Sequence, residues 1–371
     1  MKKTLKILIP VLFLLGLGIF LFQWCQVDKI DLVSDDSQEF DKAVVTEILT
    51  DNIQEDGSRV GNQEVKIRFL SGKRKGKETE AVSTNGSLYG ATCHVGSKVI
   101  TLTNQSGEIT ITSVYSLDRG PIVIGFVLFF FLLLIMVGGK NGLKAVIGLS
   151  IAFALILLFL FPAIYRGMSP VLAAIITVSL TTILTIFILA GYSKKSYAAI
   201  LGTISGVIFS GIAAWLFGKI AHISGYNVSN IDSLLSVANL TNIKVGDLLF
   251  AGILISSLGA VMDVGLSIAS TVTEIHDANP DLNWKELFHR GMNVGKDMMG
   301  TMSNTLILAF AGGSLSELML DYAYDLPYLQ LINSYTIGIE IMQGIAGSIG
   351  IILTVPLVSF FSSVLMESRK L

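Results

Sequence analysis

Seven apolar stretches, most of them close to the length of a membrane-crossing helix, follow one another after residue 120. They cover residues 122–137, 145–164, 170–191, 198–217, 248–270, 302–320 and 337–364. A helix needs about 20 apolar residues to cross the hydrocarbon core of a bilayer. With a further apolar run before residue 23, the sequence predicts an α-helical polytopic membrane protein with about eight transmembrane helices.

Charged residues make up only 15% of the chain, whereas soluble domains average about 25%. The formal net charge is −2, and no basic stripe with interleaved aromatic residues is present, so we expect no nucleic-acid partner. The two cysteines, Cys25 and Cys93, are too few for a disulfide scaffold or a cysteine-rich metal site. Both fall on the predicted outer side, which leaves a bridge between them open.

Three domains follow from this pattern. Residues 1–23 are expected to be an N-terminal transmembrane anchor. No small-x-small cleavage site follows the apolar run, which favours an anchor that is not cleaved. Cleavage as a signal peptide is the alternative. Residues 24–119 are richer in charges, and Val65–Phe69 alternates with the period of a half-buried strand before the turn signal Ser71-Gly72. We predict a small β-rich domain there, with an OB-like barrel as one candidate. Residues 120–371 are expected to be a seven-helix transmembrane domain.

The basic residues predict which loops are cytoplasmic, because lysine and arginine are in excess in cytoplasmic loops. With the N-terminus inside, the inner loops and the C-terminus hold Lys140, Lys144, Lys194, Lys195, Lys285, Arg290, Lys296, Arg369 and Lys370. The short outer loops hold only Arg166, Lys219 and Lys244. We therefore expect a multi-pass protein of the cell membrane with both termini cytoplasmic and residues 24–119 extracytoplasmic.

Ionisable and amide side chains appear at membrane depth only in the last three spans. In residues 248–274 the polar positions recur at steps of three or four, so they share one helix face. Charged groups in lipid are costly and commonly mark ion or substrate pathways, although they can also clamp neighbouring helices together. The candidate residues of a substrate or ion path are Asp263, Ser267, Glu274, Asp297, Asn304, Glu340 and Gln343.

Two further signals concern the loop and span after residue 271. Residues 283–288 are expected to form a short amphipathic helix at the interface, capped by Asp281 or Asn283. Gly312-Gly313-Ser314 interrupts the span 302–320, as glycine pairs do where a membrane helix breaks or closely contacts another.

The acid-bearing part of the chain resembles the signature of the YibE/F-like membrane proteins. The resemblance is carried by residues 258–264, 267–270, Glu274-Ile275, Asn279-Pro280, 291–297 and 300–310. Lys296 is a mild departure, since the family more often has arginine there. The resemblance covers roughly residues 40–365 and implies a bacterial multi-pass membrane protein that pairs with a related membrane protein. It does not by itself imply an activity.

Three functions remain to be distinguished. The first is a secondary transporter or permease for a small solute or ion, based on the acids at membrane depth. The alternative is a membrane scaffold or interaction protein that uses the outer β-domain to bind a partner. The third, an intramembrane enzyme, rests only on the paired acids and on His276 with His289, because no catalytic or phosphate-binding motif is present. We expect no cofactor, and the expected partners are the lipid bilayer and a related membrane protein or a second copy of the chain.

Overall fold

The computed structural model describes residues 16, 18, 19, 21–27, 38–54, 59–84, 89–106 and 109–367. The chain forms two compact units. One spans Lys29–Leu133 and contains the strands, and the other combines Met1–Asp28 with Leu134–Leu371 and contains most of the helices. Each unit is considered by itself.

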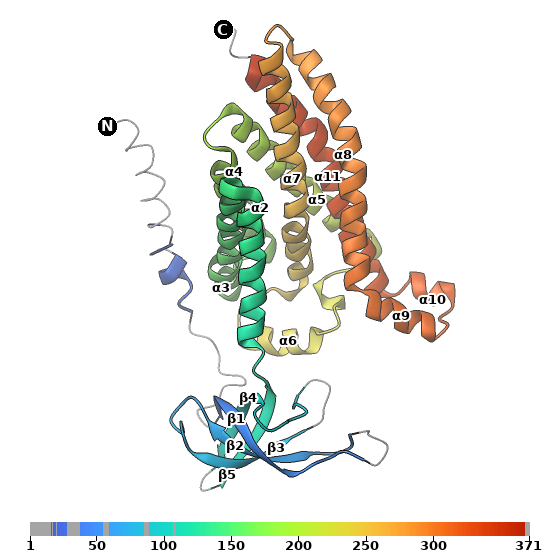
Figure 1. The fold of residues 1–371 in the computed structure, drawn as a ribbon. Coiled ribbons are helices and arrows are strands. Elements are labelled where there is room, and N and C mark those ends of the chain that lie inside the picture. The colour runs from blue at the N-terminus through green and yellow to red at the C-terminus, as the bar shows by residue number, and fades with distance from the viewer. Residues whose placement is uncertain are drawn as a thin grey trace. The chain divides into compact units, whose positions relative to one another are not determined.

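The strands form a closed five-stranded barrel (Figure 1). They are β1 (Gln38–Thr50), β2 (Gln63–Phe69), β3 (Glu78–Ser83), β4 (Lys98–Ser106) and β5 (Ile109–Leu117), in the order β1-β2-β3-β5-β4. All neighbours pair antiparallel except β3 and β5, which pair parallel. The predicted alternation is observed, since Val65, Ile67 and Phe69 are buried in the barrel core. The expected small β-barrel is therefore confirmed, and five strands are the number that an OB-fold uses.

Gln63 ties a loop to the barrel wall. Its buried amide donates to the Cys93 carbonyl at 3.0 Å and accepts from the Cys93 N–H at 2.8 Å. These two hydrogen bonds satisfy the backbone N–H and C=O groups of Cys93, which would be costly to bury without partners. The Cys93 side chain is fully buried, and this burial raises the pKa of its thiol. Cys25 and Cys93 are both free thiols.

Among the described residues, five helices are long and apolar enough to cross a membrane, or six if a bent pair counts as one span. The helices are α2 (Gly120–Leu155), α3 (Phe161–Tyr165), α4 (Pro170–Ala190), α5 (Lys194–Ala221), α6 (Ile231–Leu240), α7 (Leu248–Ala278), α8 (Trp284–Gly313), α9 (Leu315–Ala323), α10 (Tyr328–Ile332) and α11 (Tyr335–Glu367). The expected helical membrane architecture is confirmed at this level, and the count of eight spans stays a prediction.

A sharp break at Gly139 divides α2. Gly139 has a φ of 54°, and a Cβ added at Gly142 would overlap the carbonyl oxygen of Leu134. In a straight helix, two residues eight positions apart lie about 12 Å from each other along the axis. The chain therefore turns back at Gly139, between the two predicted stretches 122–137 and 145–164. A π-helical turn at Ile156–Leu160 then leads into α3, which has Pro162 in its first turn.

The predicted anchor at residues 1–23 lies mostly outside the described residues. Its described end is helical at residues 21–24. Leu21 is buried with Leu155 and Phe159, and the Trp24 ring stacks on Phe159 at 5.9 Å. The Arg166 guanidinium lies 4.3 Å from the centre of the Trp24 ring. This end of the segment is thus fixed to the helical unit.

The structure corrects one boundary. A separate short helix at residues 283–288 was expected, but α8 runs without interruption from Trp284 to Gly313. Asn283 caps this helix and forms a reciprocal capping box with Glu286. Of the two expected caps, Asp281 and Asn283, the second is therefore confirmed. The prediction of a separate helix was wrong because the helix that begins after the Asn283 cap continues without a break to Gly313. The interruption at Gly312-Gly313-Ser314 is confirmed, since α9 is bent by 61° from α8.

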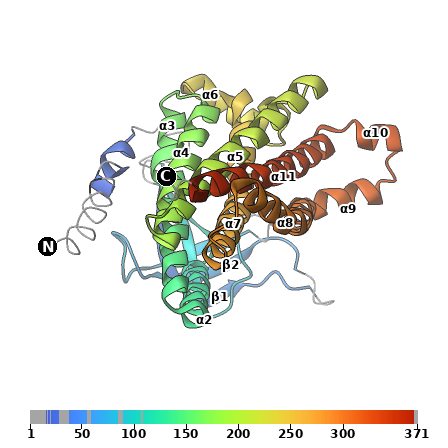
Figure 2. The same cartoon turned by 90° about the horizontal axis from the view of Figure 1, so that it is seen from above.

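Glycines allow α5 and α11 to approach closely at the centre of the helical unit (Figure 2). A Cβ at Gly206 of α5 would overlap the Thr354 hydroxyl and lie 3.1 Å from the Gly350 carbonyl oxygen. A Cβ at Gly202 would overlap the Val358 side chain. Small residues at helix contacts are the usual means of packing in membranes, where apolar burial drives helix association little. We infer that this crossing fixes the framework on which α7 and α8 pack.

Replacing Gly206 by valine is therefore expected to destabilise the protein, because the crossing has no room for the side chain. Overpacking of this kind costs about 1–3 kcal/mol. The matched control is Gly252→Val on α7, where an added Cβ meets nothing within 4 Å. Thermal unfolding in detergent should show a lower Tm for Gly206→Val and little change for Gly252→Val. Equal Tm values for the two variants would contradict the proposed role of the crossing.

Candidate functional site

Asp263 lies at the middle of α7, with about 22 Å of helix on either side of it. The opposite face of the helix is buried, as Val261, Val264 and Ile268 show. The Asp263 side chain is exposed on the surface of the helical unit. The polar spacing noted in the sequence thus marks the side of α7 that the rest of the helical unit leaves uncovered.

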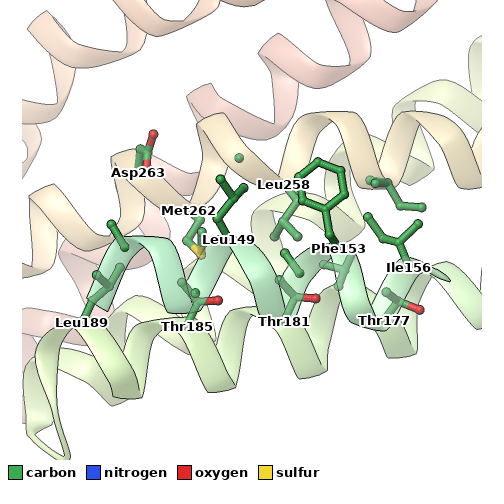
Figure 3. A pocket seen from close by; sticks show the side chains of 16 residues that line it. Leu149, Phe153, Ile156, Thr177, Thr181, Thr185, Leu189, Leu258, Met262 and Asp263 are labelled. Atoms are coloured by element: carbon green, nitrogen blue, oxygen red, sulfur yellow. The ribbon is translucent and has the colours of Figure 1, made fainter. Parts of the chain in front are cut away.

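Asp263 lines one end of an open groove, which we call the threonine groove (Figure 3). Its volume is about 350 Å³, and its walls come from α2 after the break, from α4 and from α7. Three threonines of α4, one helical turn apart, line one wall: Thr177, Thr181 and Thr185. Asp263 lies towards the end of the groove that holds Thr185 and Leu189. Asp263 is the only ionisable residue in the lining of the groove.

The hydroxyl groups of this wall differ in what they bind. Thr177 donates its hydroxyl to the Ala173 carbonyl at 2.8 Å, within its own helix. Thr185 is only 5% exposed, and its Oγ1 has no hydrogen-bond partner among the described residues. Its methyl group packs against α2, since a Cβ at Gly148 would lie 2.9 Å from Thr185 Cγ2. A buried hydroxyl without a partner is uncommon in folded proteins and calls for an explanation.

The carboxylate of Asp263 likewise has no hydrogen bond or ion pair within the described part of the chain. An isolated carboxylate in an apolar environment is strongly disfavoured unless a cation, a proton or water reaches it. The groove therefore places a lone acid at one end of a largely apolar lining. This acid can bind a proton or a cation.

The remaining sequence candidates lie elsewhere. Glu340 is half-buried on α11 and lines a second groove of about 320 Å³, formed with α8 and α9. Gln343 is half-buried on α11, outside the lining of both grooves. Asp263 and Glu340 therefore do not share a cavity. Whether any of these residues belongs to a transport path stays a prediction.

The packing of α7 against α8 gives the depth of the candidates on α8. A Cβ at Gly295 would lie 3.2 Å from Ile268 Cδ1, and one at Gly291 would lie 2.8 Å from Val272 Cγ2. Continuing this antiparallel register places Gly300 level with Asp263. Asn304, which is exposed, is then about one turn further along α8.

The other polar candidates on α7 and α8 are Ser267, Glu274 and Asp297. Ser267 is half-buried one turn from Asp263 on α7, and Glu274 and Asp297 are exposed nearer the loop that joins α7 to α8. Among the described residues, no group of three histidines, cysteines, aspartates or glutamates is placed to hold a metal ion. His276 is buried, with its Nδ1 3.6 Å from the Asp277 carboxylate, whereas Glu274 and His289 are exposed.

Sequence reasoning missed the threonine wall. No candidate was predicted in residues 170–191, because threonine is common in membrane helices and can satisfy its hydroxyl within its own helix. The spacing of four residues between Thr177, Thr181 and Thr185 was the available signal, since it places all three on one face of α4. It does not show which helix that face meets.

Comparison with known proteins identifies the family and nothing finer. Neither a search of curated proteins nor a search of solved structures found a match. The family model described as YibE/F-like protein matches residues 126–368, which are more than half of the chain. The matched range includes every residue that lines the threonine groove. The chain therefore belongs to the YibE/F-like family.

Proposed function

We propose that the protein is a secondary transporter or permease for a small solute or ion, with Asp263 as the group that binds a cation or proton. The observation that carries this proposal is the unpaired carboxylate at the middle of α7, at the edge of the threonine groove. A charged side chain at the centre of a membrane helix costs about 2.5–3.5 kcal/mol on insertion scales. The described residues offer this carboxylate no hydrogen bond or ion pair, so a structural clamp among them does not account for it.

The mechanism that follows is an exchange of partners at Asp263. In one conformation the carboxylate accepts a proton or cation from one side of the membrane, and in the other conformation it releases that ion to the opposite side. Transport would be coupled to an ion gradient or to no energy source, because the sequence contains no nucleotide-binding motif.

Replacing Asp263 by asparagine should abolish flux, since the amide keeps the shape of the side chain but cannot bind a proton or balance a cation. The measurement is ion or proton flux into proteoliposomes with a pH-sensitive dye and a panel of cations. We expect at least a tenfold loss of flux with an unchanged Tm.

The control for this experiment is Glu317→Gln, an exposed acid on α9 that lies outside both grooves. This variant should keep the flux of the wild type. Full flux in Asp263→Asn would overturn the role of Asp263. Absence of flux in a well-folded wild type would overturn the transporter proposal as a whole.

The proposal includes the topology that the basic residues predict, with eight spans, a cytoplasmic N-terminus and an extracytoplasmic barrel. Single cysteines test it in a background carrying Cys25→Ser and Cys93→Ala. Lys75→Cys, in the exposed turn between β2 and β3, should react in intact cells with a membrane-impermeant maleimide. Asn141→Cys, exposed just after the break in α2, should react only after permeabilisation. The reverse pattern would invert the topology.

One observation favours the alternative function of a membrane scaffold. Three aromatic side chains form an exposed cluster on the barrel. The Tyr115 ring lies 5.3 Å from Phe40 and 5.4 Å from Tyr89, and Phe40 and Tyr89 are more than half exposed. Exposed aromatic clusters are typical of binding surfaces. A scaffold would show no flux of its own, and substitutions in this cluster, not Asp263→Asn, would remove its function.

A further inference from the structure

The threonine groove has the shape of a binding site for an elongated molecule. Its lining extends along α4 from Thr177 to Leu189, which is about 18 Å of helix, and along α2 from Ala145 to Ile156, about 16 Å. Its volume of about 350 Å³ falls within the range of small-molecule pockets. A compact ion alone would leave most of this space empty.

The chemistry of the lining is apolar except at specific points. Leucine, isoleucine, phenylalanine, methionine, valine, alanine and glycine make up the walls, and the polar exceptions are the three threonines and Asp263. The Thr177 hydroxyl already donates to Ala173. The hydroxyls of Thr181 and Thr185 have no hydrogen-bond partner among the described residues, and Thr185 Oγ1 is buried out of reach of a ligand. The one charged group of the lining is the Asp263 carboxylate, which lies towards the Leu189 end.

We propose that the threonine groove binds an elongated apolar cation of the alkylammonium class, with its charged end at Asp263 and its apolar chain along α2 and α4. This inference rests on the proposed function, because it names the substrate class of the same site. The ammonium group compensates the charge of the Asp263 carboxylate. The chain packs against Leu149, Phe153 and Ile156, which an ion without an apolar part would not use.

Charge distinguishes this occupant from a lipid. An acyl chain could also fill the apolar part of the groove, but it would leave the carboxylate without a partner. An anion would be repelled, because Asp263 has no ion pair with a cation among the described residues and electrostatic interactions are strong in an apolar environment. Binding that depends on Asp263 and discriminates by charge is therefore the signature of the proposed site.

The test measures binding of three ligands to the full chain in phosphatidylcholine nanodiscs, with empty nanodiscs subtracted. The ligands are decylammonium, decyltrimethylammonium and decyl sulfate, which share the same alkyl chain. We expect both cations to bind at least tenfold more tightly than the anion. Asp263→Asn should weaken the binding of both cations by at least tenfold.

Glu340→Gln is the matched control, because Glu340 lines the second groove. It should bind all three ligands like the wild type. Equal binding of cations and anion, or unchanged binding by a folded Asp263→Asn, would overturn the inference and leave a lipid-filled groove. Ion flux that depends on Asp263, together with no preference for the alkyl cations, would overturn this inference alone. Selective cation binding without flux would support it and overturn the transporter proposal.

Discussion

An aspartate in the middle of a membrane helix has to find a counter-charge, a proton or water, and the account of this protein depends on how Asp263 does so. The helical unit buries one face of α7 in its core and leaves the face with Asp263 uncovered. The framework therefore presents the acid at the edge of a groove instead of neutralising it. Such a group is costly in lipid, so its position is most simply explained by a ligand that binds there.

The framework itself is held by close helix contacts. Glycines at the crossing of α5 and α11 bring the two backbones together, and α7 and α8 pack against this pair through Gly265, Gly291 and Gly295. Many threonine and serine hydroxyls in the core bond to carbonyls of their own helices, as those of Thr182, Thr354 and Ser363 do. This arrangement satisfies many polar groups locally. The hydroxyls of six buried or half-buried residues have no partner among the described residues, namely Thr185, Thr203, Ser210, Ser303, Ser359 and Ser362.

Much of the fold could be predicted because it is encoded locally. Alternation in Val65–Phe69 gives a barrel strand, Asn283 and Glu286 give the start of α8, and Gly312-Gly313-Ser314 gives its end. The uncovered face of α7 was predictable as a polar stripe for the same reason. The groove was not, because it depends on which faces of α2, α4 and α7 meet. The separation of Asp263 from Glu340 was likewise invisible, since both lie on long helices whose packing partners sequence spacing does not specify.

The most direct test of the central claim is chemical. Dicyclohexylcarbodiimide is an apolar reagent that modifies protonated carboxyl groups reached from an apolar environment. Treatment of the full chain in proteoliposomes, followed by peptide mass spectrometry and a flux assay, reports both the site and its importance. The account predicts modification at Asp263, none at Glu317, and a loss of flux in proportion to the modified fraction. Unmodified Asp263, or full flux after complete modification of Asp263, would contradict it.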